Sequence, residues 1–150
     1  ELPGACVTAT DISAAALVVA KRNARGLELE NSVTFLEGDL FQPVEGAFDI
    51  IVSNPPYIGA AEYETLAAGV KDYEPPLALL AGQTGLEFYE RLVNQAPGYL
   101  KKNGWILLEI GAKQAESVHA IMSGLYDRIR VRADYAGLSR VIKGRRKPLG

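Results

Sequence analysis

The chain has 150 residues, of which 48% are hydrophobic and 23% charged, and its net charge is −2. This composition predicts one globular domain over residues 1–150, and the acidic balance argues against a surface devoted to nucleic-acid phosphates. The single cysteine, Cys6, excludes an internal disulfide framework and fits a reducing cytoplasm. No apolar run reaches the roughly 18–20 residues that a membrane-spanning helix needs.

The first third of the chain alternates strand-like and helix-like segments. Predicted strands cover residues 7–10, 33–37 and 49–53. Between the first two, Ser13 is placed to cap a helix that runs to Arg25 and stops at Gly26. The third strand (DIIVS) carries three successive β-branched residues, which is typical of a strand covered on both faces in a parallel sheet.

The rest of the chain continues this alternation after a loop rich in Gly, Pro and Tyr, in which we expect a short helical turn near residues 62–68. Thr84 and Glu87 have capping-box spacing and start a helix that Pro97 should kink or shorten. The later predicted elements are a strand at 105–110, a helix at 112–125, and strands at 128–132 and 140–143 that form an antiparallel edge hairpin.

This order of elements predicts an α/β doubly wound sheet, mostly parallel with an antiparallel edge hairpin. Ligands of such sheets bind at the carboxyl ends of the strands. Four polar residues lie at or near predicted strand ends, and we expect them to converge on one edge: Asp11, Asp39, Asn54 and Glu109.

The two acidic residues of this set are suited to a nucleoside-bearing cofactor. Asp11 can accept hydrogen bonds from two ribose hydroxyls while Ile12 packs on the base. Asp39 can accept a hydrogen bond from the exocyclic amine of the adenine, with Leu40 and Phe41 lining the pocket. The alternative interpretation is that carboxylates at strand ends only start turns or cap helices.

The stretch FDIIVSNPPY ends a buried strand on a polar, rigid corner. An amide nitrogen is a poor nucleophile, and a site can orient it by accepting both of its N–H hydrogens. The side-chain oxygen of Asn54 and the backbone carbonyl of Pro55 offer two such acceptors, whereas Pro56 adds no competing N–H. Tyr57 can stack on a planar amide or base. The alternative is a plain turn, since Asn-Pro is a common turn dipeptide.

With these residues in view, the chain resembles the HemK/PrmC-type peptide-chain release factor glutamine N5-methyltransferases. NPPY alone is shared with methyltransferases that act on adenine or guanine amines, but its combination with YEPPLALLAGQTGLEFY and LLEIG is far narrower. The matching blocks are TATDIS (8–13), EGDLF (37–41), FDIIVSNPPYI (48–58), YEPPLALLAGQTGLEFY (73–89), GWILLEIG (104–111) and LSRVIKGRR (138–146).

The resemblance implies a Rossmann-like class I methyltransferase sheet, S-adenosylmethionine as cofactor, and methyl transfer to the amide nitrogen of a Gly-Gly-Gln glutamine in a release factor. On this basis Asp11 binds the ribose and Asp39 the adenine region. Asn54 and Pro55 hold the glutamine amide beside Tyr57. Glu74 belongs to the substrate-side wall.

The chain also departs from the family pattern. The glycine-rich cofactor loop on the first strand and the N-terminal helical domain are missing, and residues 1–4 take the place of the end of the helix after that loop. We therefore expect exposed strand edges that promote self-association, or pairing of the Asp11 strand with the Asn54 strand. We also expect weak cofactor binding and little turnover by the chain alone.

Two other functions stay open at this point. One is a nucleic-acid amine methyltransferase, and the other is an inactive remnant that only binds a protein partner. A basic tail either contacts such a partner or is a solvated edge: Arg140, Lys143, Arg145, Arg146 and Lys147. His119 has no partner at ligand spacing, and the sequence shows no metal constellation.

Overall fold

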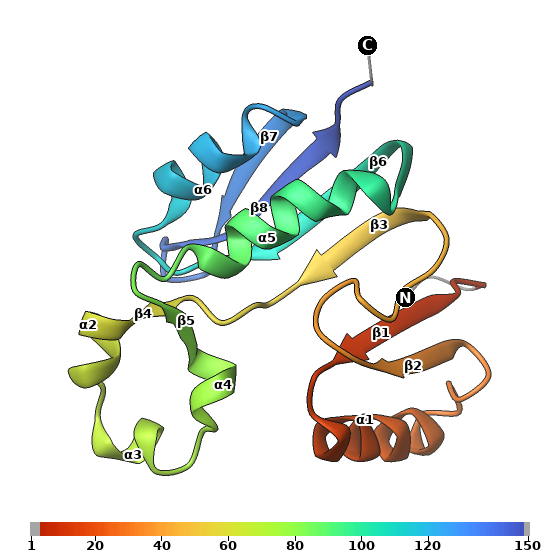
Figure 1. The fold of residues 1–150 in the computed structure, drawn as a ribbon, viewed down its shortest axis with the longest axis horizontal. Helices are drawn as coiled ribbons and strands as arrows, with labels where there is room; N and C mark the ends of the chain where they lie inside the picture. Colours follow the sequence, from red (N-terminus) through yellow and green to blue (C-terminus); the bar gives the residue numbers. More distant parts are fainter. Residues whose placement is uncertain (1–3, 149–150) are drawn as a thin grey trace. The chain divides into compact units, whose positions relative to one another are not determined.

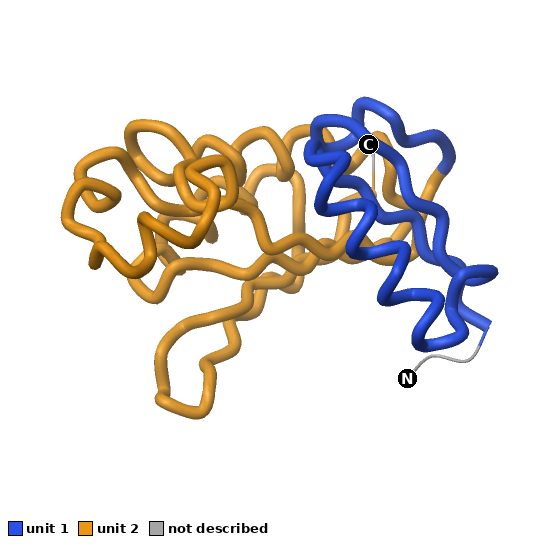
Figure 2. The backbone as a smooth tube through the Cα atoms, turned by 90° about the horizontal axis from the view of Figure 1, so that it is seen from below, with its two compact units in different colours: residues 1–46 blue, residues 47–150 orange. Residues whose placement is uncertain are grey.

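The structure is a computed structural model that describes residues 4–148. It divides into two compact units, Glu1–Gly46 and Ala47–Gly150, which Figure 2 colours separately. Residues 1–3 of the expected helix end lie outside the described residues. Among the residues that are described, none of the helices combines the length and the hydropathy needed to cross a membrane.

The first unit is a strand–helix–strand motif, as predicted (Figure 1). It consists of β1 (Val7–Asp11), α1 (Ala14–Gly26) and β2 (Val33–Glu37), and the two strands pair in parallel with Asp11 opposite Glu37. The Ser13 hydroxyl accepts a hydrogen bond from the amide of Ala16 at 3.2 Å, which confirms the predicted cap.

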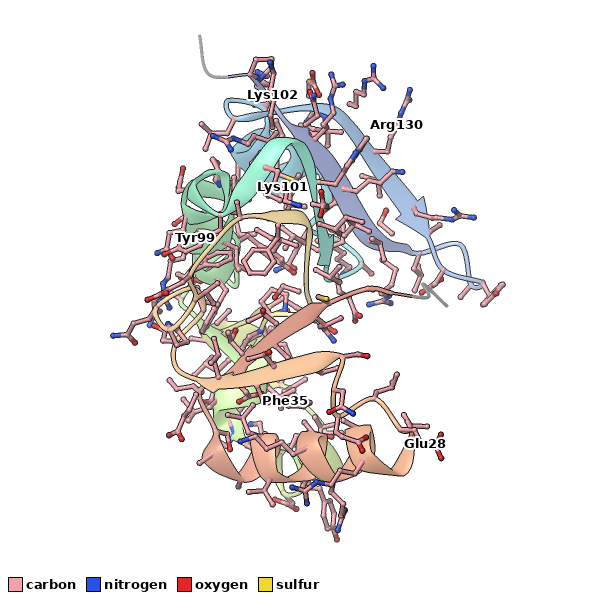
Figure 3. The ribbon with its side chains drawn as sticks, turned by 90° about the vertical axis from the view of Figure 1, so that its right-hand side faces the viewer. Glu28, Phe35, Tyr99, Lys101, Lys102 and Arg130 are labelled. Atoms are coloured by element: carbon pink, nitrogen blue, oxygen red, sulfur yellow. The ribbon has the colours of Figure 1, made fainter. Side chains whose placement is uncertain are left out.

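The end of α1 differs from the prediction. Gly26 is still helical, and the residue in the left-handed region is Glu28, with φ 56° (labelled in Figure 3). The amide of Leu29 donates to the carbonyl of Ala24 at 2.8 Å and that of Glu28 to Arg25 at 3.1 Å. This is the Schellman pattern, and it places the left-handed residue two positions after the glycine.

The second unit is built on one four-stranded sheet with the order β3-β6-β8-β7. Its strands are β3 (Phe48–Ser53), β6 (Leu100–Glu109), β7 (Tyr126–Ala133) and β8 (Ser139–Arg146). Strand β6 pairs with β3 in parallel and with β8 antiparallel, and β7 closes the edge antiparallel to β8. The predicted edge hairpin is therefore confirmed.

Strands β1 and β2 pair with each other within the first unit. The expected pairing of the Asp11 strand with the Asn54 strand would join the two units and stays a prediction. The other expectation, contact with another chain through strand edges, also stays a prediction.

The core of the second unit lies between its sheet and two helices, α5 (Glu87–Gln95) and α6 (Ala115–Met122) (Figure 1). Alternate residues of β6 are buried, as expected for a strand with one covered face. The fully buried side chains include Tyr89, Val93, Ile106, Leu108, Val118, Met122, Tyr126 and Ile142. The short 3-10 helix η1 (Ala96–Gly98) contains Pro97 and follows α5, so the predicted shortening is confirmed.

Between β3 and α5 the chain makes a detour of three short helices, where the sequence indicated one helical turn (Figure 1). A parallel pair, Ile58 opposite Leu80, closes the base of the detour. The amine of Lys71 donates to the carbonyl of Glu64 at 2.8 Å and lies over the ring of Tyr63, which braces the first two helices. The elements are β4 (Ile58–Gly59), α2 (Ala60–Glu64), α3 (Ala68–Lys71), α4 (Pro76–Leu79) and β5 (Leu80–Gly82).

We expect Ile142→Ala to lower the free energy of unfolding by about 2–5 kcal/mol, because it opens a cavity in the core beneath β8. Ile142 is 0% exposed, with Leu108 and Val131 as its cross-strand neighbours. Leu138→Ala, at a residue 48% exposed in the hairpin turn, is the matched control and should cost at most about 1 kcal/mol. Urea unfolding measures both, and equal losses would contradict this placement of the core.

Candidate functional site

Asn54 and Glu109 share the carboxyl edge of the second unit's sheet. The parallel register of β3 and β6 pairs Ser53 with Leu108, so that Asn54 leaves β3 where Glu109 closes β6. This part of the predicted convergence is seen within the unit. Asp11 and Asp39 belong to the other unit, where they share a sheet edge of their own.

A cavity of about 550 Å³ lies at the Asn54 corner. Its volume is in the range of small-molecule and side-chain binding sites. Its lining includes Asn54, Pro55 and Tyr57 from the corner, and Val70, Tyr73 and Glu74 from the detour. Asn54 is exposed and Pro55 buried, so the corner is fixed on one side and open on the other.

The sequence prediction singled out four of the ten lining residues, namely Asn54, Pro55, Tyr57 and Glu74. Glu74, expected in the substrate-side wall, does line the cavity, whereas Pro56 is not part of the lining. Val70 and Tyr73 were missed. Tyr73 carried a signal, because it opens the YEPPLAL block, and its side chain is 87% exposed.

The corner is tied to the rest of its unit by a residue that sequence reasoning also missed. The side-chain amide of Gln114 donates to the backbone carbonyl of Tyr57 at 2.9 Å. The two residues are 57 positions apart in the chain, and no local pattern signals such a contact.

In the first unit the two predicted cofactor carboxylates follow neighbouring strands. The amide of Gly38 donates to the carbonyl of Asp11 at 3.0 Å, which brings Asp39 to the same edge. One carboxylate oxygen of Asp11 accepts the amide of Ser13 at 2.8 Å. Asp11 therefore does start the turn into α1, as the alternative interpretation held, and it remains exposed.

The residues that follow these two acids differ in exposure and in backbone conformation. Ile12 is 60% exposed, whereas Phe41 is buried. Leu40 lies in the left-handed region with φ 49°, which is costly for a leucine. A cavity of about 230 Å³ in this unit is lined by Lys21, Arg25, Glu30, Val33 and Phe35 (Figure 3 labels Phe35) and by none of the predicted cofactor residues.

The start of α5 carries the most perturbed carboxylate of the site region. An oxygen of Glu87 accepts the backbone amide of Thr84 at 2.8 Å, and this hydrogen bond lowers the Glu87 pKa to about 2. One half of the predicted capping box is thus confirmed. The Thr84 hydroxyl accepts from the amide of Leu86 at 3.2 Å.

The basic tail is engaged within the chain. Arg145 makes a bidentate pair with Asp127 at 2.8 and 2.9 Å, which lowers the Asp127 pKa, and Arg140 pairs with Asp134. Lys143 lies over the ring of Trp105, Arg146 donates to the Leu100 carbonyl, and Lys147 donates to the Ser123 carbonyl at 2.7 Å. Figure 3 labels other cations of this sheet, of which Lys101 pairs with Asp49 at 2.8 Å.

Two solved structures with a similar architecture carry the names of methyltransferases. A methyltransferase from Pyrococcus furiosus superposes with a TM-score of 0.68 at 22% identity, over 93% of this chain and 62% of that one. A ribosomal protein L11 methylase from Lactobacillus delbrueckii subsp. bulgaricus gives 0.62 at 21% identity, over 95% and 58%. Such identities show the fold alone. The fold is that of the class I S-adenosylmethionine-dependent methyltransferases, as predicted.

Sequence relatives indicate the group of methyltransferases that the chain is similar to. A family profile described as "Methyltransferase small domain" matches residues 1–70. A release factor glutamine methyltransferase from Koribacter versatilis is 42% identical over 97% of this chain and 52% of its own length, and one from Moorella thermoacetica is 46% identical over 93% and 50%. The predicted resemblance to release factor glutamine methyltransferases is confirmed. The chain spans about half the length of these curated relatives.

We expect the stability of the chain to fall steeply with acid because of Glu87. Its pKa is lowered on folding, so its contribution is fully present above about pH 4.5 and is lost as the pH falls toward about 2. Glu87→Gln should flatten this acid limb, as measured by urea midpoints across that range. The matched control is Glu90→Gln, exposed on the same helix, which should keep the slope. An unchanged acid limb in Glu87→Gln would contradict the assignment.

Proposed function

We propose that residues 1–150 are part of a methyltransferase domain that transfers a methyl group from S-adenosylmethionine to the side-chain amide nitrogen of the Gly-Gly-Gln glutamine in peptide-chain release factors. The names of the relatives support this substrate, and the fold supports the cofactor class. The partner is then a protein of the translation machinery, which puts the chain in the cytoplasm.

The observation that carries the proposal is the cavity at the Asn54 corner. The exposed Asn54 side chain supplies one amide oxygen, and Pro55 supplies a backbone carbonyl. Two acceptors in the plane of a substrate carboxamide fix both of its N–H hydrogens and so aim its nitrogen. Catalysis by these residues is therefore chiefly positioning.

The neighbours of these acceptors have supporting roles. Pro56 has no N–H, so it offers no donor that would compete for the same oxygens. Tyr57 and Glu74 also line the cavity, and in the proposal Tyr57 packs on the substrate amide while Glu74 belongs to the substrate-side wall. A carboxylate in that wall favours a peptide segment that presents N–H groups, such as glycines.

The cofactor residues proposed in the first unit are Asp11, Ile12, Asp39 and Leu40. One oxygen of the exposed Asp11 carboxylate accepts a hydrogen bond from the Ser13 amide. The second oxygen is suited to accept hydrogen bonds from ribose hydroxyls. Asp39, at the same edge, fits an adenine amine. When bound, S-adenosylmethionine would supply a sulfonium methyl group: the C–S bond breaks as the N–C bond forms, S-adenosylhomocysteine leaves, and the amide nitrogen loses one proton to solvent.

A transfer assay with labelled S-adenosylmethionine tests the proposal. The chain is assayed alone and with an added upstream glycine-rich segment, against release factor, RNA and DNA. Label in the release factor, located at the glutamine by tandem mass spectrometry, supports the proposal for either form. Label in a nucleic-acid base, or none in any substrate for both forms, contradicts it.

We expect Asn54→Ala to reduce methyl transfer on the order of 100-fold or more, because one of the two amide acceptors is lost. Binding of S-adenosylmethionine, measured by equilibrium dialysis, should change by less than about threefold. Asn94→Ala, on the exposed side of α5, is the matched control and should leave transfer unchanged. Loss of cofactor binding as the main effect would show that the role assigned to Asn54 is wrong.

A further inference from the structure

Gln114 lies directly before α6 and is half-buried among three segments of the second unit. Its amide nitrogen donates to the carbonyl of Tyr57 at 2.9 Å and to that of Gly85 at 3.2 Å. Its amide oxygen accepts the amide of Gly111 at 3.0 Å. A glutamine amide has two hydrogens to donate, and here both go to backbone carbonyls.

The orientation of this amide is fixed by its partners. The carbonyls of Tyr57 and Gly85 can only accept, whereas the Gly111 N–H can only donate, so a flipped amide would lose all three bonds. The Tyr89 hydroxyl lies 3.0 Å from the Glu109 carbonyl and 3.3 Å from the Gln114 oxygen. Burial raises the Tyr89 pKa above its ordinary value, so this hydroxyl stays a donor.

Two glycines make room for the amide. Gly85 has φ +82°, and a Cβ there would lie 2.6 Å from the Tyr57 carbonyl and 3.0 Å from the Gln114 nitrogen. A Cβ at Gly111 would lie 2.7 Å from the Gln114 oxygen. Backbone therefore encloses the amide on both sides, and few other side chains fit this space.

The Asn54 corner needs an anchor of this kind. Pro55 and Pro56 have no N–H, so these two residues cannot donate to any neighbouring backbone carbonyl. The Gln114 bond to Tyr57 acts at the end of this proline pair and links it to Gly111, just after β6, and to Gly85 in the loop before α5.

We propose that Gln114 is a positioning residue for methyl transfer. Its amide holds the Tyr57 carbonyl and thereby fixes the direction in which the Asn54 side chain and the Pro55 carbonyl face the cavity. This inference rests on the proposed function for its effect on the reaction, but its structural part can be measured without any substrate.

The test variant is Gln114→Glu, which keeps the shape but places a carboxylate against two carbonyl oxygens. Gln95→Glu, the same change at an exposed position on α5, is the matched control. In the enzyme form that is active, we expect kcat to fall about 10–100-fold in Gln114→Glu, with KM for the release factor within about threefold.

The readout that does not depend on activity is the nitrogen-15 NMR spectrum of the chain. We expect the Asn54 side-chain amide and the Ile58 backbone amide to shift in Gln114→Glu, while the amide of the core residue Ile142 keeps its position. Gln114→Met, flexible and uncharged, is the second variant in case the carboxylate prevents folding, and it should cause the same shifts.

The outcomes separate the two proposals. Asn54 and Ile58 signals that move no more than in Gln95→Glu overturn the role of Gln114. Unfolding of both Gln114 variants also overturns it, because Gln114 would then serve the fold rather than the corner. A wild-type protein that methylates no release factor overturns the proposed function, while the NMR comparison still decides the structural part.

Discussion

A carboxamide nitrogen is held in a fixed direction when two acceptors take both of its hydrogens. The Gln114 amide shows this arrangement, because the carbonyls of Tyr57 and Gly85 accept hydrogen bonds from it. The proposed function uses it a second time, with the Asn54 oxygen and the Pro55 carbonyl as acceptors for a substrate glutamine. Neighbouring residues of one corner would thus bind two glutamine amides, one internal and one external.

The two prolines explain why the corner depends on outside support. They restrict the backbone torsions but remove two N–H groups, so the segment cannot secure itself by ladder bonds. Support comes from side chains and from close backbone contact: the Gln114 amide, and Gly85, whose missing Cβ allows the approach of the Tyr57 carbonyl. The detour at residues 58–82 adds the other wall of the cavity, closed at its base by β4 and β5.

Much of this architecture could be predicted from local patterns. The strand Val33–Glu37 was predicted with its observed bounds, because VTFLE is β-prone and Gly38 ends it. The Thr84–Glu87 spacing correctly indicated the carboxylate that reaches back to the Thr84 amide. NPPY directed attention to three residues that line the cavity, Asn54, Pro55 and Tyr57. The expectation that the strand before it is covered on both faces is wrong for this structure, because β3 is an edge strand of its sheet and Ile50 and Val52 are exposed.

The features that the sequence prediction missed have different causes. Strands of two and three residues, such as β4 and β5, are too short to show any periodicity. The left-handed turn at Glu28 is set by the bond from Leu29 to Ala24, and its position cannot be read from Gly26. Gln114 was missed because its partners are backbone carbonyls 57 and 29 residues away.

The most direct test of the central claim is a crystal structure of the protein with a peptide containing Gly-Gly-Gln. The account predicts that the glutamine amide nitrogen lies in the cavity, within about 2.7–3.2 Å of both the Asn54 side-chain oxygen and the Pro55 carbonyl. A peptide bound with its glutamine outside the cavity, or with its amide oxygen rather than its nitrogen toward these two acceptors, would contradict the account.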